Sequence, residues 1–278
     1  MFDKLKFLSH YKGLRREIYV LFFGRVVTNL GSMVWPMLTM IMSQKLGMNA
    51  STIAAVMVLA GVIMVPANIA GGKLADNFNK KNIIVGFDTV SIVCYVVCAF
   101  TPLSMTTIIM MLMAGLCQSL EGPSYNSLIA DLTTTADRAK AYSLQYLGGN
   151  LGLVLSPTIA GLLFKNYLWL SFLISGIAIG CSTVLIFFKI RDITPVEDNS
   201  AESVYQKSRS DVSIFTVLKE NKVVLLFSVT VSLYYAAYHQ YGYLMPLEMG
   251  RVHGESGAAL YGTVSSLNCI VVVLFTPL

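Results

Sequence analysis

The segment GGKLADNFNKK, from Gly71 to Lys81, carries charges of both signs between two long apolar runs. Those runs, 52–74 and 83–104, are each long enough to cross about 30 Å of hydrocarbon as a helix. A short polar link between them predicts a helical hairpin with its turn at a membrane surface. Asn79 lies in the turn, and asparagine accepts positive φ more readily than most non-glycine residues. We expect Asn79 to shape the turn in this way.

The composition extends this interpretation to the whole chain. Of the 278 residues, 55% are hydrophobic and 13% are charged, and the mean hydropathy is +0.66. These values exclude an ordinary water-soluble domain. Continuous apolar runs exclude an outer-membrane barrel, whose strands alternate apolar and polar residues. Eight stretches can span a membrane, and all should be helical because lipid offers backbone groups no partner. They are 18–43, 52–74, 83–104, 106–130, 141–164, 167–188, 223–247 and 256–278.

Basic residues are distributed unevenly between the two sides of this predicted bundle. If the N-terminus is cytoplasmic, sixteen of the 20 Lys and Arg residues fall on that side. Lys45, Lys165 and Arg251 fall on the other side, and Arg25 lies inside the first span. This bias predicts a multi-pass protein of the inner or plasma membrane with a cytoplasmic N-terminus. The net charge of +5 follows from topology and contact with anionic lipid, so no nucleic-acid partner is expected.

Several other classes of protein and site are disfavoured. Residues 1–17 are basic, but the next apolar run is a full span without a small-residue cleavage site, which predicts a cytoplasmic tail instead of a removed signal peptide. All five cysteines fall inside predicted spans, where they pack well, and the three histidines are scattered. The chain contains no phosphate-binding loop of the Gly-Lys-Ser or Gly-Lys-Thr type. We therefore expect no enzyme, no cofactor and no metal site.

The order of Gly72, Leu74, Asp76, Lys80 and Lys81 in the hairpin resembles the loop after the second span of major facilitator superfamily transporters. Lysine stands at position 80 where the family usually has arginine, so an ion pair there should be weaker and less directional. The resemblance implies an all-α fold, a polytopic transmembrane helical bundle. In this superfamily two six-helix halves are joined by a cytoplasmic loop.

That architecture divides the chain into four parts. A cytoplasmic tail, 1–17, precedes a six-helix first half, 18–188, and a polar linker, 189–222. The remaining residues, 223–278, would form the first two spans of a second half. A complete member would continue for four more spans, so we expect a truncated chain and a full-length protein that functions as a monomer.

The fifth span contains GGNLGLVLSPTIAG, from Gly148 to Gly161. Gly148, Gly152, Pro157 and Gly161 are similar to the signature on the fifth helix of antiporter members, and 121–152 looks like the proton-linked drug-exporting branch. Glycines four residues apart permit close helix approach, and the proline removes a backbone donor. These features predict a helix that lies against the other half and flexes. A tightly packed helix pair without a mechanistic role is the alternative.

Ionisable residues inside membrane spans are costly and by default functional. Arg25 lies roughly 10 Å from the inner end of the first span, and Glu121 lies roughly 15 Å from the inner end of the fourth. The resemblance places both helices around a central cavity. Glu121 is therefore predicted to bind the transported proton or a cationic substrate, with Arg25 setting its affinity. A static buried ion pair is the alternative. Asp88, nearer the cytoplasmic face, is expected to be solvated or paired with a loop.

The resemblance also implies a gate at the cytoplasmic end of the bundle. In such a gate Asp76, Lys80 and Asp131 form a charge network that holds the inner side shut. Gly72 and Lys81 belong to the same hairpin motif. For Asp131 the alternative is a solvated helix end without a gating role.

Aromatic and soft side chains are candidates for a substrate cavity. Tyrosines on one face of the seventh span, beside a histidine, could stack on planar cations, although an aromatic belt at the outer interface is the alternative. Methionines along the first span offer an adaptable wall or simply fill a helix interface. Asn29 is included, with an interhelical hydrogen bond as its alternative role. The predicted cavity residues are Asn29, Met33, Met37, Tyr234, Tyr238, His239 and Tyr241.

These features together predict a secondary active transporter, with proton-coupled efflux of drugs or other small amphipathic molecules as the favoured activity. Its partners would be a small-molecule substrate, protons and membrane lipid. Two alternatives remain open. One is a proton symporter that imports a small nutrient. The other is a non-transporting membrane sensor or assembly protein that retains the fold.

Overall fold

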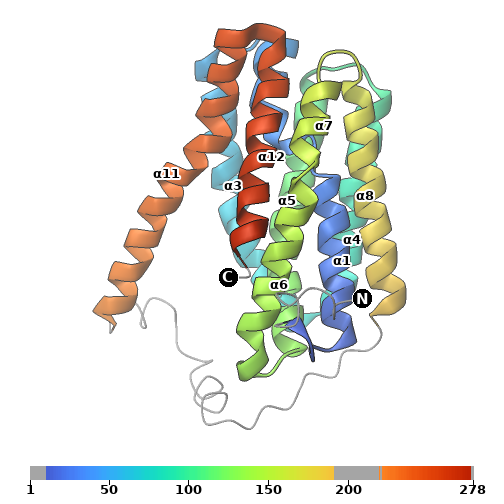
Figure 1. Ribbon diagram of the computed structural model, residues 1–278, viewed down its shortest axis with the longest axis vertical. Coiled ribbons are helices and arrows are strands. Elements are labelled where there is room, and N and C mark those ends of the chain that lie inside the picture. The colour runs from blue at the N-terminus through green and yellow to red at the C-terminus, as the bar shows by residue number, and fades with distance from the viewer. Residues whose placement is uncertain (1–10, 191–218, 220, 277–278) are drawn as a thin grey trace.

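In the computed structural model, residues 11–190, 219 and 221–276 are described, and they form an all-helical bundle (Figure 1). Eight helical segments in this part are long and apolar enough to cross a membrane. This confirms the predicted fold class and the eight predicted spans. The main helices are α1 (Arg16–Leu30), α3 (Ala50–Asn77), α4 (Lys80–Phe100), α5 (Met105–Asp131), α6 (Thr135–Leu153), α7 (Ser156–Leu163), α8 (Leu168–Lys189), α11 (Lys222–His253) and α12 (Gly257–Phe275). Of these, α6 and α7 together form one segment, the fifth.

The hairpin between α3 and α4 is present, but the turn is built differently from the prediction. Asn79 has φ −64°, and no described residue other than glycine has positive φ. Its side chain accepts a hydrogen bond from the Asn82 backbone N–H at 3.3 Å. Asn79 is therefore the N-cap of α4, and the prediction that it adopts positive φ was wrong. The extended backbone that capping requires excludes the left-handed conformation.

The first span is interrupted near the middle of the bundle. After α1 the chain bends at Gly31 and continues through η3 (Trp35–Met37), α2 (Leu38–Met40) and the π-helical η4 (Ile41–Lys45). The Gly31 carbonyl, released by the bend, accepts a hydrogen bond from the Ser175 hydroxyl on α8. A Cβ at position 31 would overlap the Ala178 side chain, so α1 and α8 approach closely here because Gly31 has none.

The fifth span is also interrupted, between α6 and α7. Pro157 lies in the first turn of α7, where its missing N–H and fixed φ are tolerated. Because proline cannot donate to the preceding turn, the break falls just before it. The expected bend is thus a division of the span into two helices.

Two hydrophobic clusters hold the first six spans together. One, called here the upper hydrophobic cluster, includes Met37, Tyr95 and Phe172, and the other, the lower hydrophobic cluster, includes Leu21 and Leu128. The middle turns of α1, α4, α5 and α8 lie between these clusters. By contrast, α11 slants away from the bundle (Figure 1), and of its described residues only one, a proline, is buried.

Candidate functional site

A cavity of about 320 Å³ lies between the two hydrophobic clusters, enclosed by α1, α4, α5 and α8. Its polar lining groups come from the middle of all four helices, and it contains both predicted coupling residues. It is lined by Arg25, Thr28, Asn29, Gly31, Ser32, Asp88, Tyr95, Gln118, Glu121, Gly122, Tyr125, Asn126, Ser175 and Ile179. A polar chamber inside an apolar bundle is costly, which marks it as the candidate site.

The acidic wall of the cavity is made by Glu121 on α5 and Asp88 on α4. Their carboxyl groups lie within hydrogen-bonding reach of each other. Ionised carboxylates only accept hydrogen bonds, so a hydrogen bond between these two groups requires a proton on one of them. The Oε2 atom of Glu121 is buried and has no hydrogen-bond partner. One oxygen of the pair is therefore open to a ligand or a proton.

Asp88 was expected to be solvated or paired with a loop, and that prediction was wrong. The side chain is only 7% exposed, and its Oδ2 accepts a hydrogen bond of 2.6 Å from the Thr183 hydroxyl on α8. The expectation misjudged which face of α4 carries Asp88. Ile84, Asp88, Ser91 and Tyr95 are all buried at spacings of three and four residues. That periodicity is the signal by which Asp88 could have been assigned to the packed face of α4.

Arg25 faces Glu121 across the cavity without forming an ion pair with it. The two groups interact electrostatically, but in the described part of the chain no acid lies within ion-pair distance of Arg25. The guanidinium carbon lies 5.5 Å from the centre of the Tyr125 ring, over its face. The Tyr125 hydroxyl in turn donates a 2.8 Å hydrogen bond to the Leu21 carbonyl. Arg25 is thus positioned by an aromatic ring that α1 itself anchors.

A second pocket of about 400 Å³ adjoins the first and shares Arg25, Asn29, Tyr125 and Asn126 with it. Its remaining wall comes mainly from α6, with Ile129 on α5 and Tyr238 on α11, and is rich in aromatic and amide side chains. Asn29 lines both chambers, although its amide donates within its own helix, to the Arg25 carbonyl.

The other predicted cavity residues lie elsewhere. Met33 and Met37 are buried in the upper hydrophobic cluster, as the packing alternative had it. Tyr234 is exposed and stacks on Tyr238, with ring centres 5.9 Å apart. His239 is exposed and neighbours tyrosine rings on α11. Tyr241 makes a 3.0 Å hydrogen bond with Ser265 on α12.

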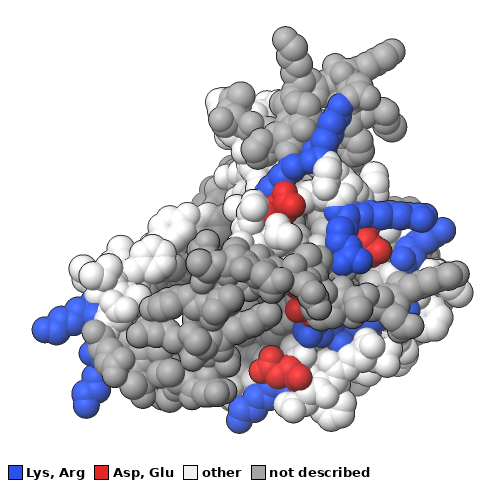
Figure 2. Space-filling model, turned by 90° about the horizontal axis from the view of Figure 1, so that it is seen from below, with Lys and Arg blue, Asp and Glu red and all other residues white. Residues whose placement is uncertain are grey.

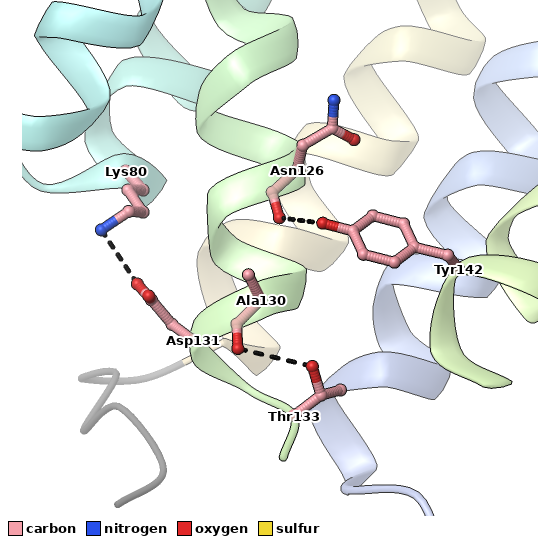
Figure 3. Close-up of polar contacts among 6 residues, drawn as sticks. All are labelled: Lys80, Asn126, Ala130, Asp131, Thr133 and Tyr142. Atoms are coloured by element: carbon pink, nitrogen blue, oxygen red, sulfur yellow. Dashed lines mark hydrogen bonds and ion pairs between the residues drawn. The ribbon is translucent and has the colours of Figure 1, made fainter. Parts of the chain in front are cut away.

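At the lower end of the bundle, Lys80 at the start of α4 forms a 2.9 Å ion pair with Asp131 at the end of α5 (Figure 3). Asp76 is exposed and makes no ion pair with any described residue, so the three-membered network is reduced here to two members. Lys81 turns toward the Phe187 ring, and Gly72 faces open space. Figure 2, a view onto this end, shows basic side chains around its rim with fewer acidic ones among them.

The glycines of the fifth span face two different partners. A Cβ at Gly148 would lie 2.8 Å from the Phe22 ring, and one at Gly152 would lie 2.7 Å from the Asn29 Cβ, so α6 packs tightly on α1. A Cβ at Gly161 would lie 2.8 Å from the Ala259 Cα, so α7 packs on α12. Both α6 and α7 contact α12, but of the signature's glycines only Gly161 faces α12, whereas Gly148 and Gly152 face α1.

Comparison with known proteins identifies the class. A family model described as Major Facilitator Superfamily matches residues 21–278. The chain therefore belongs to the Major Facilitator Superfamily, and the resemblance seen in the hairpin is confirmed. It is 26% identical over 257 residues to YqjV of Bacillus subtilis (strain 168), an uncharacterized MFS-type transporter. The aligned region covers 90% of this chain and 60% of YqjV. The chain thus spans about 60% of the length of this relative.

Other similar proteins include transporters of stated activity. A Na(+), Li(+), K(+)/H(+) antiporter of Planococcus maritimus is 22% identical, covering 95% of this chain and 68% of that protein. The structure of a bacterial homologue of the human lysosomal transporter Spinster, in an inward-facing and unoccupied conformation, superimposes on this chain with a TM-score of 0.68 at 17% identity. The superposition covers 94% of this chain and 61% of the Spinster homologue. A D-xylose-proton symporter gives 0.61 at 15% identity, covering 92% and 67%. Likenesses at these identities establish the shared fold.

Proposed function

We propose that the protein is a proton-coupled secondary transporter that exports small amphipathic molecules. The observation that supports it most is the polar cavity, in which Glu121 and Arg25 face each other in the middle of the bundle. A carboxyl group there can exchange a proton, and a cationic substrate would compete with that proton for the same negative charge. Competition of this kind yields exchange, because proton release accompanies substrate binding.

The test is transport in proteoliposomes that contain the complete natural protein and an internal pH-sensitive dye. Ethidium serves as the amphipathic cation. Exchange predicts that ethidium and protons move in opposite directions. Movement of both in the same direction would replace the exporter with a symporter. No movement of either with ethidium or alkali cations would favour a non-transporting role.

A second candidate is exchange of an alkali cation for protons. Two carboxyl groups in one cavity suit a monovalent cation, and the Planococcus maritimus relative is named for Na(+), Li(+) and K(+) exchange. In the same liposomes, gradients of Na⁺, Li⁺ or K⁺ in place of ethidium distinguish the two substrates. Alkalinisation driven by an alkali cation but not by ethidium would select this candidate.

We propose that the charged end of the bundle, with Lys80 and Asp131, faces the cytoplasm. The basic residues gathered there support this orientation. A cysteine at Lys73, at the same end, should be labelled by an impermeant maleimide only from the cytoplasmic side, and one at Lys165 only from outside. The background variant must be free of the native cysteines. Labelling of both positions from one side would contradict the proposed topology.

A further inference from the structure

We propose that Asp88 and Glu121 act as one proton-holding unit, in which Thr183 is the positioning residue that lets Asp88 gain or lose a proton without moving. The inference deepens the proposed function, since it assigns two residues to the same cavity. The protonation change can nevertheless be measured without transport.

The central observation is that the Thr183 hydroxyl has two acceptors and one hydrogen. Its Oγ1 lies 2.6 Å from the Asp88 Oδ2 and 2.8 Å from the Ile179 carbonyl oxygen. A hydroxyl donates one hydrogen bond and accepts up to two. When Asp88 is ionised, Thr183 donates to its carboxylate. When Asp88 carries a proton on Oδ2, it donates to Thr183, whose own hydrogen turns to the Ile179 carbonyl.

Both protonation states of Asp88 therefore keep this hydrogen bond in the same heavy-atom geometry. This matters in a buried site, where leaving a polar group without a hydrogen-bond partner is costly. A fixed donor such as a backbone N–H would favour only the ionised state. A rotating hydroxyl with a spare acceptor accommodates either state, and Thr183 is the hydroxyl that reaches Asp88.

Charged and titratable neighbours of Asp88 lie on two facing helices. On α5 these are Glu121, Cys117 and Tyr125, and on α1 the neighbour is Arg25. The described residues of α8 that line the cavity, Ser175 and Ile179, do not titrate. Of these titratable groups, Glu121 is the one within hydrogen-bonding reach of Asp88.

The two acids are inequivalent within this unit. Asp88 is anchored by Thr183, whereas the Glu121 Oε2 has no partner and is the open end. A proton on Glu121 that transfers to Asp88 breaks the Glu121 O–H bond and forms an Asp88 O–H bond, so the net charge is unchanged. Glu121 is then the free carboxylate and can accept a second proton or a cation. The pair can thus take up a proton at Glu121, the open end, and pass it to Asp88.

Infrared difference spectroscopy of the complete protein in lipid, recorded as a function of pH, tests this directly. Protonated carboxyl groups give a C=O band that is free of other protein absorption. The wild-type spectrum should contain a pH-dependent contribution that Asp88→Asn removes and another that Glu121→Gln removes. In Thr183→Val the Asp88 band should move to higher wavenumber because its hydrogen bond is lost, and Thr183→Ser should restore it.

Controls separate this role from simple packing. Thr89→Val removes a hydroxyl that donates only to its own helix, to the Val85 carbonyl on α4, and should leave the carboxyl bands unchanged. An Asp88→Asn spectrum identical to the wild type would overturn the proposal, as would equal bands in Thr183→Val and wild type. If Asp88→Asn does not fold, the Val and Ser variants of Thr183 still decide. Transport that fails while the bands behave as expected would refute the proposed function alone.

Discussion

Asp76 and Asp88 belong to the same helical hairpin, yet they lie in opposite environments. Asp76 is exposed near the end of α3 and has no ion-pair partner in the described part of the chain, whereas Asp88 is buried in α4 and bonded to Thr183. Water solvates an acid at a helix end, so that acid needs no counter-charge. An acid between packed helices must find its partners inside the protein. The position of an acid along its helix, and the helix face that carries it, therefore decide whether it becomes part of a buried site.

The same contrast separates the two ion-handling regions. Lys80 and Asp131 are about a quarter exposed, at 24% and 27%, so their ion pair is partly screened by solvent. The carboxyl groups of Asp88 and Glu121 are enclosed between helices, where each hydrogen bond counts for more. We therefore expect substitutions in the cavity to have large effects and substitutions at the charged end to have small ones.

The largest effect is expected from Glu121→Gln. The amide keeps the shape of the side chain but cannot carry the exchanged proton, so proton-coupled flux in proteoliposomes should fall to background. Glu17→Gln is the matched control, because Glu17 pairs with Arg15 at the start of α1, outside the cavity. Equal loss of flux in both variants would show that proton coupling does not depend on the cavity environment of Glu121.

Glycines at packed and open positions should also differ in their effect on stability. Gly152→Ala places a Cβ 2.7 Å from that of Asn29, which forces α6 away from α1 and should destabilise the protein by about 1–3 kcal/mol. Gly86→Ala, on α4, meets no atom within 4 Å and should be neutral or slightly stabilising. Thermal unfolding in detergent measures both. Similar midpoints for the two variants would contradict the close α1–α6 packing.

Much of the fold could be predicted because membrane helices are fixed by the length of apolar runs. The run expected at 83–104 is observed as Lys80–Phe100, and its neighbours agree as well. The interruption of the first span could not be predicted in this way. It depends on the close approach of Gly31 to Ala178 on α8, a tertiary contact that leaves no trace in hydropathy.

The site was accessible from sequence only in part. Arg25 and Glu121 stood out because they are charges within apolar runs, and both line the cavity. Thr183 could not be identified, since a threonine in a membrane helix usually bonds to its own backbone, and its contact with Asp88 depends on how α4 and α8 face each other. Asp76 was expected in the gate because it occupies its place in the hairpin motif. A motif fixes the order of residues along the chain, but it does not fix the conformation in which their side chains meet.

A smaller effect is expected where the charged end is broken. Asp131→Asn removes the partner of Lys80 and should destabilise the observed conformation by about 0.2–1 kcal/mol, as for a partly exposed ion pair. Asp76→Asn should not change the thermal midpoint, since Asp76 has no ion pair to lose with the described residues. Raising the salt concentration should reduce the difference between the two variants. A larger loss in Asp76→Asn would restore the three-membered network.

The smallest effect is expected from Lys80→Arg, which restores the residue usual in the family. Arginine can bind the Asp131 carboxylate through two parallel hydrogen bonds where lysine offers a point charge, so the pair should strengthen. Solvent screening limits the gain to a few tenths of a kcal/mol, about a twofold shift toward the conformation in which α4 and α5 are joined. The measurement is the rate at which an impermeant reagent labels a cysteine at Asn126, a cavity residue, in the complete protein. A modest decrease in rate, lost on combining Lys80→Arg with Asp131→Asn, would assign the effect to this pair. A decrease that survives in the double variant would mean that the new arginine binds elsewhere, and would contradict its assignment to Asp131.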